Sequence, residues 1–77
     1  MYFVYVLKKA KNKELYYDYT DNLERRVQQH NLRYNNKLIY YEAYLSESDA
    51  RRREKRLKNY GQSITYLKSR IKDSLVM

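Results

Sequence analysis

Apolar and polar positions divide the chain into short segments with two different periodicities. Residues 2–7 form an unbroken aromatic and β-branched run, which is typical of a central strand covered on both faces. The polar residues 8–14 follow, with Asn12 as the best turn former, and they lead into a second β-favouring run at residues 15–19. The two runs together predict an antiparallel hairpin.

The second run alternates its side chains between the two faces of the predicted sheet. A period of two places Tyr16 and Asp18 on one face, and Leu15, Tyr17 and Tyr19 on the other. The hydroxyl of Tyr16 and the carboxylate of Asp18 are therefore expected on the same side of the sheet.

A helix is predicted for about residues 22–30, directly after the second strand. Its candidate N-caps are Thr20, Asp21 and Asn22, and Glu24 completes a capping-box spacing with Asp21. Within this helix Arg26 and His30 stand four residues apart, so they share one face and can reach a common ligand. We expect a short loop over residues 31–36, with Asn35 and Asn36 marking the turn.

The second half of the chain predicts one strand and two helices. Residues 37–45 form the third strand, and residues 46–49 supply a second capping box that opens a helix. Gly61, the only glycine, is expected at the C′ position of that helix, because glycine adopts the left-handed conformation freely. Ser63 is then expected to cap a last helix, whose apolar stripe comprises Ile64, Leu67, Ile71 and Leu75.

These elements give the order β-β-α-β-α-α. The fold class is α+β, with a small three-stranded antiparallel sheet and packed helices in a single domain spanning residues 1–77. A chain of 77 residues has a small core, so its helices must share one sheet to be stable.

Composition limits the chemistry that this domain can perform. The chain has no cysteine and one histidine, which excludes disulfides and thiolate zinc sites and disfavours a histidine metal site. Any metal should therefore be a hard ion on oxygen ligands. The longest apolar run is much shorter than the roughly 20 residues of a membrane span, and no signal-peptide pattern is present, so we expect a cytoplasmic protein without membrane contact.

Net charge points to a polyanionic partner. Seventeen Lys and Arg residues against nine Asp and Glu leave a net charge of +8, and eleven tyrosines accompany them. Basic groups interleaved with aromatic rings suit contacts to phosphates and to bases or sugars. The alternative is that the tyrosines fill the rim of the core and that the charge only keeps the protein soluble.

The second predicted helix carries six positive charges around a single carboxylate, Glu54, between residues 51 and 58. One interpretation is a solvated face on which Glu54 pairs with neighbours such as Lys58. The other notes that Glu54 lies one turn from both Ala50 and Leu57, near the apolar boundary. There it is a candidate ligand for one Mg²⁺ ion.

Five segments, in order, resemble the GIY-YIG nuclease domain, and more closely the compact single-domain proteins similar to the amino-terminal nuclease module of the ABC excinuclease. Val4-Tyr5-Val6 stands at the first motif, and Tyr16-Tyr17-Asp18 stands at the second. Residues 20–31 resemble the helix that follows, and residues 38–42 resemble the third strand. Residues 46–58, with their Ala-x-x-x-Glu-x-x-Leu-Lys pattern, resemble the helix that bears the metal-binding glutamate.

The resemblance implies a role for each matching residue. The motif tyrosines are Tyr5 and Tyr16, the catalytic arginine is Arg26, its helix partner is His30, and the ligand of a single Mg²⁺ or Mn²⁺ ion is Glu54. The implied reaction is hydrolysis of DNA phosphodiesters, without a small-molecule cofactor, in roles such as DNA repair. Either Tyr5 or His30 could be the general base. We expect these five side chains to converge over one side of the sheet. We also expect cations at Arg25, Arg51, Arg52, Lys55 and Lys58 to contact DNA.

Two departures from the family pattern affect the expected activity. The second motif ends in glycine in the family, but Asp18 stands there in this chain, and a carboxylate brings bulk and negative charge to a phosphate site. Asp18 could add a metal ligand or repel DNA. The link from His30 to the third strand, residues 31–36, is also shorter than in related domains.

Three functional classes therefore follow from the sequence. The first is a divalent-metal-dependent endonuclease, with activity weakened by Asp18 and the short link. The second is a nucleic-acid-binding module that does not cleave. The third is a truncated or engineered scaffold of the same fold, whose charge serves only solubility.

Overall fold

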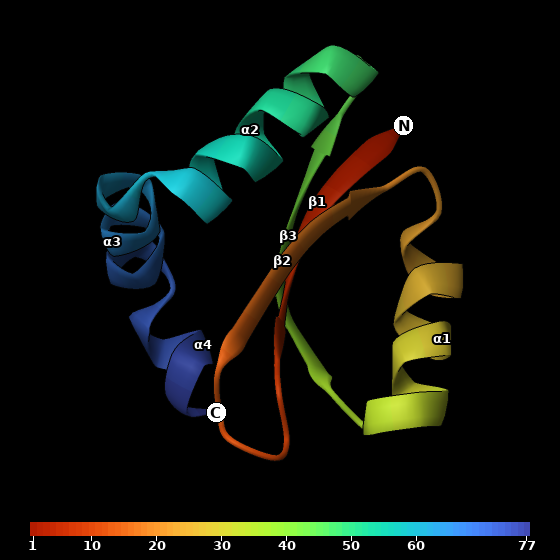
Figure 1. Cartoon of the computed structure of the whole chain (residues 1–77), viewed down its shortest axis with the longest axis vertical. Helices are drawn as coiled ribbons and strands as arrows, with labels where there is room; N and C mark the ends of the chain where they lie inside the picture. The colour runs from red at the N-terminus through yellow and green to blue at the C-terminus, as the bar shows by residue number, and fades with distance from the viewer.

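Three strands and four helices follow one another in the order β-β-α-β-α-α-α (Figure 1). The computed structural model describes the backbone of residues 1–77 and the side chains of residues 1–32 and 35–77. The elements are β1 (Tyr2–Lys8), β2 (Leu15–Thr20), α1 (Leu23–Tyr34), β3 (Lys37–Tyr44), α2 (Glu47–Asn59), α3 (Gly61–Arg70) and α4 (Lys72–Val76). The α+β class and the three-stranded antiparallel sheet are confirmed.

Strand β1 lies in the centre of the sheet, in the order β2-β1-β3. It pairs antiparallel with both neighbours, so Tyr5 lies opposite Asp18 of β2 and opposite Tyr41 of β3. Its residues 4–7 are all 0% exposed, which confirms the prediction of a strand covered on both faces. Strand β2 is consequently an edge strand, and its outer backbone groups are open to a partner.

The helices form two layers on opposite faces of the sheet (Figure 1). Helices α2, α3 and α4 cover one face, where the buried core comprises Val4, Val6, Ala50, Leu57, Leu67 and Ile71. Helix α1 lies on the other face, where the rings of Tyr5 and Tyr16 meet His30. The predicted alternation of side chains along β2 is therefore confirmed, because Tyr17 and Tyr19 pack against the first layer and Tyr16 faces the second.

A hydrogen-bonded carboxylate fixes α2 to β3. Glu42 accepts two bonds from Nε of Arg53, at 3.2 and 3.1 Å, and one from the Tyr40 hydroxyl at 2.9 Å. The Tyr44 hydroxyl also donates to it. Since Arg53 is held toward β3, the rotation of α2 about its axis is set by this network as well as by the buried Leu57.

The link after His30 differs from the prediction. Residues 31–34 continue α1 as helix, where the sequence predicts a loop, and Asn35 ends it in the left-handed conformation with φ 52°. The backbone N–H of Asn35 donates to the carbonyl of Asn31 at 3.3 Å. Asparagine tolerates this conformation, so the turn at Asn35 and Asn36 is confirmed.

The predicted boundary at Gly61 is wrong. Tyr60, with φ −123° and ψ 107°, ends α2 and begins α3, so the extended backbone of one residue makes the turn. Gly61 is the first residue of α3 and has no positive φ. Ser63 lies inside that helix and does not cap it, since its N–H donates to the carbonyl of Tyr60 at 3.0 Å.

The last predicted helix is interrupted at Ile71, which separates α3 from α4. Leu67 and Ile71 are buried nevertheless, so the predicted apolar stripe does dock on the sheet. The second capping box is confirmed only in part, because Ser46 is the N-cap of α2 but its side chain makes no capping bond. Among the described residues, no helix is long and apolar enough to cross a membrane.

Candidate active site at the edge of β2

The turn from β2 into α1 is built by short polar side chains. The hydroxyl of Thr20 accepts the backbone N–H of Asn22 at 3.1 Å, and the Asn22 side chain accepts the backbone N–H of Arg25 at 3.0 Å. Asn22 is thus the N-cap of α1 among the three candidates. This turn fixes the start of α1 and therefore the direction of Arg26 and His30 along it.

Four of the five residues implied by the family resemblance come together on this face. The ring centroids of Tyr5 and Tyr16 are 6.3 Å apart, those of Tyr5 and His30 are 6.3 Å apart, and those of Tyr16 and His30 are 5.0 Å apart. Arg26 lies one helical turn before His30 on the same side of α1. We call these four residues the ring cluster.

Asp18 is a direct neighbour of the ring cluster. One oxygen of its carboxylate accepts the Tyr16 hydroxyl at 2.8 Å, and the other accepts the backbone N–H of Tyr19 at 2.8 Å. A side chain that the family replaces by glycine therefore holds the hydroxyl of a motif tyrosine.

Both motif tyrosines are held in their neutral form. Burial raises the pKa of Tyr5 well above its usual value, and the negative charge of Asp18 raises it further. Burial and the hydrogen bond to Asp18 raise the pKa of Tyr16 to about 12, although Arg26 opposes this. Near neutral pH each phenol is therefore a hydrogen-bond donor and not a base.

His30 is shifted toward the neutral imidazole. Burial lowers its pKa below the usual value, the guanidinium of Arg26 lowers it further, and Asp18 opposes both. Nδ1 of His30 and the hydroxyl of Tyr5 are buried without a hydrogen-bond partner among the described residues. A buried polar atom left unpaired costs stability, and such atoms gather at functional sites.

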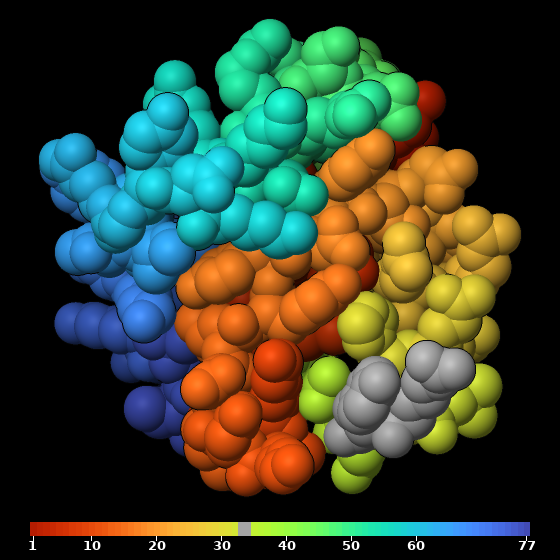
Figure 2. All heavy atoms as spheres, viewed as in Figure 1, coloured from red at the N-terminus to blue at the C-terminus, as the bar shows by residue number. Residues whose placement is uncertain are grey.

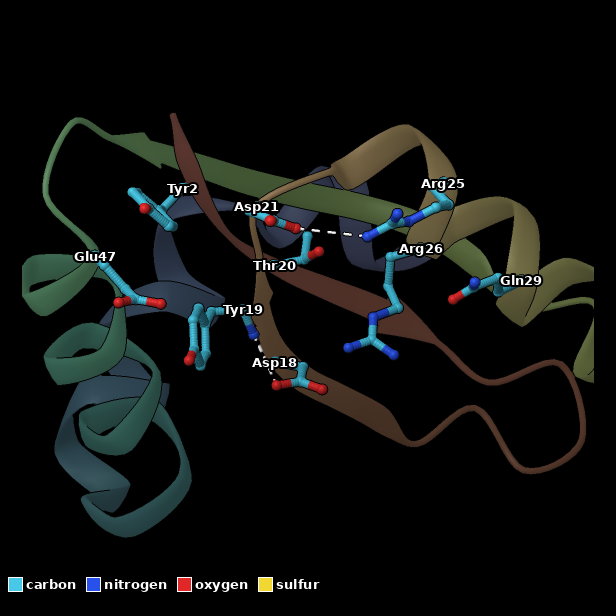
Figure 3. A pocket seen from close by; sticks show the side chains of 9 residues that line it. All are labelled: Tyr2, Asp18, Tyr19, Thr20, Asp21, Arg25, Arg26, Gln29 and Glu47. Carbon is cyan, nitrogen blue, oxygen red and sulfur yellow. Dashed lines mark hydrogen bonds and ion pairs between the residues drawn. The ribbon is translucent and has the colours of Figure 1, made fainter.

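A cavity of about 370 Å³ opens between α1 and the start of α2 (Figure 3). Arg26 extends from α1 with its guanidinium toward Asp18, whereas Arg25 pairs with Asp21 at 3.7 Å. Arg26 forms no ion pair with any described side chain, so its charge remains available. We call this the Asp18 cavity; its lining is Tyr2, Asp18, Tyr19, Thr20, Asp21, Arg25, Arg26, Gln29 and Glu47.

A second cavity, of about 490 Å³, lies on the other side of Tyr16 and His30. We call it the Lys9 cavity; its lining is Lys9, Lys11, Asn12, Tyr16, His30 and Asn36. The polar pattern of residues 8–14 predicts a turn and gives its two lysines no role at the site. Strand parity offers a signal for Lys9, which has the same parity as Tyr5 and Leu7 and so continues their face.

Glu54 comes from the other layer, on α2. Arg51 lies 5.9 Å from the centre of the Tyr19 ring of β2, and Arg53 pairs with Glu42 of β3, so these two residues mark opposite flanks of α2. Glu54 is three residues from Arg51, which places it on the flank toward β2. Its side chain is 14% exposed and lies 3.5 Å from Nζ of Lys58.

No hydrogen bond, ion pair or ring contact among the described side chains joins Glu54 to the ring cluster. A substrate that touched both would have to cross the edge of β2. Figure 2 shows that edge as the orange strip exposed between α2 in teal and α1 in yellow. The convergence expected over one side of the sheet thus holds for four residues, and the fifth approaches from across the edge strand.

The remaining predicted DNA contacts lie on exposed helix surface. Arg52 pairs with Asp49 at 3.2 Å, Lys58 with Glu54 and Arg25 with Asp21, so part of their charge is offset. Lys55 and Arg51 are exposed on α2.

The donor set fits a singly ligated hard cation better than an enclosed metal site. Within the described part of the chain, no three His, Asp or Glu side chains gather around one point. Mg²⁺ keeps several waters and is commonly held through one or two carboxylates, which Glu54 can supply from the flank of α2. Asp18 is the other nearby carboxylate, but both of its oxygens already accept hydrogen bonds.

Comparison with known families agrees with this geometry. Residues 1–69 match the model of the GIY-YIG catalytic domain. The chain therefore belongs to the GIY-YIG family, and this membership implies a nuclease-type function and a nucleic-acid substrate. No curated protein and no solved structure matches the chain.

Proposed function

We propose that the protein is a divalent-metal-dependent endonuclease that hydrolyses DNA phosphodiester bonds at the edge of β2. One observation supports this most directly: the ring cluster places Tyr5, Tyr16 and His30 within 6.3 Å of one another, one helical turn from the guanidinium-bearing Arg26. Each group in this arrangement has a role in the transfer of a phosphoryl group to water.

His30 is the general base in this proposal. Its lowered pKa keeps the imidazole neutral near pH 7, so one ring nitrogen has a free lone pair. Nδ1 is enclosed, and Nε2 is the nitrogen left to accept the proton of the attacking water. The two tyrosines have raised pKa values and serve instead as donors that orient the water or a phosphate oxygen.

Arg26 is the group that offsets the negative charge gained by the phosphoryl oxygens in the transition state. Since its guanidinium forms no ion pair with a described side chain, it can give two parallel N–H bonds to the phosphate. Glu54 is the residue that would hold Mg²⁺ or Mn²⁺, and such an ion supplies Lewis-acid polarisation of a phosphoryl oxygen when it is bound.

The experiment is nicking of supercoiled plasmid with and without Mg²⁺ or Mn²⁺. We expect metal-dependent nicking by the wild-type chain. Arg26→Ala should lower the rate by about 10²- to 10³-fold, the cost of losing one donor to developing charge. Glu54→Gln should abolish the metal dependence.

Glu14→Gln is the matched control, because Glu14 is an exposed carboxylate in the β1–β2 turn and removing it changes the net charge equally. No nicking with either metal, or equal nicking by wild type and by both site variants, would reject the proposal.

A second function, DNA binding without cleavage, is favoured by one observation. The carboxylate of Asp18 holds the Tyr16 hydroxyl at 2.8 Å and lies in the cavity that Arg26 enters (Figure 3). It therefore engages a donor and adds negative charge where a phosphate should bind. Salt-dependent DNA binding with no nicking under any metal condition would support this alternative.

A further inference from the structure

The two cavities beside Tyr16 and His30 differ in charge. The Asp18 cavity carries two guanidiniums, and its carboxylates are Asp18, Asp21 and Glu47. The Lys9 cavity carries two ammonium groups, and no carboxylate lines it among the described side chains. An anion is therefore favoured in the Lys9 cavity and is opposed in the Asp18 cavity unless a cation accompanies it.

The hairpin turn holds the two lysines in place. The backbone N–H of Lys9 donates to the carbonyl of Glu14 at 2.8 Å, and that of Lys13 donates to the carbonyl of Lys9 at 2.9 Å. The side chain of Asn12 accepts the N–H of Glu14 at 3.0 Å. A turn closed by three such bonds keeps the backbone of Lys9 and Lys11 beside the sheet.

Neighbouring Lys8 is turned away from this face. Its Nζ donates to the carbonyl of Leu75 in α4 at 2.6 Å, on the opposite side of the sheet. The alternation along the strand therefore separates a structural lysine from Lys9, which faces the layer of the ring cluster. Lys9 and Lys11 form no ion pair with any side chain that the structure describes.

We propose that the Lys9 cavity binds a backbone phosphate of the DNA strand next to the one that reacts, through Lys9 and Lys11. Tyr16 and His30 form the wall shared with this cavity, so a strand held there passes directly across the ring cluster. The inference rests on the proposed function and gives it a second contact, which sets where along its backbone the strand lies. Lys9 and Lys11 are positioning residues and take no part in the proton transfer.

The first test is the salt dependence of duplex DNA binding, measured by fluorescence anisotropy in the absence of metal. Each phosphate contact contributes about 0.9 to the slope of log K against log salt concentration. Lys9→Ala and Lys11→Ala should each lower the slope by about that amount, and Lys9→Arg should restore it. Lys68→Ala is the control, since Lys68 is exposed on α3 in the opposite layer and should leave the slope unchanged.

The second test separates positioning from chemistry. In metal-dependent nicking, both alanine variants should raise KM several-fold and leave kcat close to that of the wild type, because the lost contact is made equally before and during the reaction. Wild-type slopes and KM values in both variants would overturn the inference while leaving the nuclease function intact. Shallower slopes without any nicking would uphold this binding site and reject the nuclease.

Discussion

Replacing Asp18 with glycine tests how the departure from the family motif affects the site. The change removes a negative charge from the cavity that Arg26 enters and releases the Tyr16 hydroxyl. It also removes one cause of the raised pKa values of Tyr5 and Tyr16, so both should fall. We expect tighter DNA binding, faster nicking or both.

The magnitude follows from Coulomb's law. A phosphate charge on the order of 6 Å from the Asp18 carboxylate is repelled by about 0.7 kcal/mol in water and by about 2.8 kcal/mol at an effective dielectric constant of about 20. The open cavity lies between these limits, so a gain of about 1–2 kcal/mol is expected, or about 5- to 30-fold in affinity. Loss of the hydrogen bond and the glycine in a strand should lower the stability by about 1–3 kcal/mol.

The assay is anisotropy of a labelled duplex at fixed salt, with plasmid nicking measured beside it. Asp18→Asn separates charge from space, since it removes the charge but keeps the size of the side chain. Asp73→Asn is the control, because Asp73 is an exposed carboxylate on α4 in the other layer. Affinity and nicking that equal those of the wild type in Asp18→Gly would refute the electrostatic reasoning.

Four other substitutions test the site and the packing around it. Tyr5→Phe removes a buried hydroxyl that has no hydrogen-bond partner among the described residues, so it should raise the free energy of unfolding by about 1 kcal/mol while slowing nicking; a loss of stability in denaturant melts would contradict this. The lowered pKa of His30 means that the unfolded state binds its proton first as the pH falls, so stability should decline below about pH 6.5, and His30→Asn should remove that part of the decline in thermal melts. Glu42→Gln should weaken the tie between α2 and β3 and cost about 1–3 kcal/mol, and an unchanged melting curve would show that the network adds nothing. Leu57→Ala, at 0% exposed, should cost about 2–5 kcal/mol in the same melts, and a cost under about 1 kcal/mol would mean that the core closes around the space.

Much of the architecture could be predicted from local sequence. The apolar run at residues 2–7 identified the central strand, because only a strand buried on both faces tolerates such a run. The alternation along residues 15–19 assigned Tyr16 and Asp18 to one face. The interval of four residues between Arg26 and His30 set them on one side of a helix. Each of these follows from a fixed backbone period.

Boundaries between helices could not be predicted in the same way. Glycine at position 61 suggested a left-handed end to α2, but an extended Tyr60 makes the turn and packing of Leu67 decides where α3 lies. The extension of α1 over residues 31–34 likewise depends on where β3 must begin, since Asn35 can adopt the left-handed conformation only if the strand position allows it. These choices have small local energies, so tertiary contacts outweigh them.

The sequence by itself therefore determined the sheet, the faces of its strands, the helix that carries Arg26 and His30, and the membership in a nuclease family. Only the tertiary structure decided that Glu54 stands across the edge of β2 from the ring cluster, that Asp18 holds Tyr16, and that two cavities of unequal charge flank His30. The physical reason is that periodicity acts within one element. Distances between side chains of different elements depend on how whole layers pack and on the rotation of each helix, which buried residues and networks such as that of Glu42 fix together.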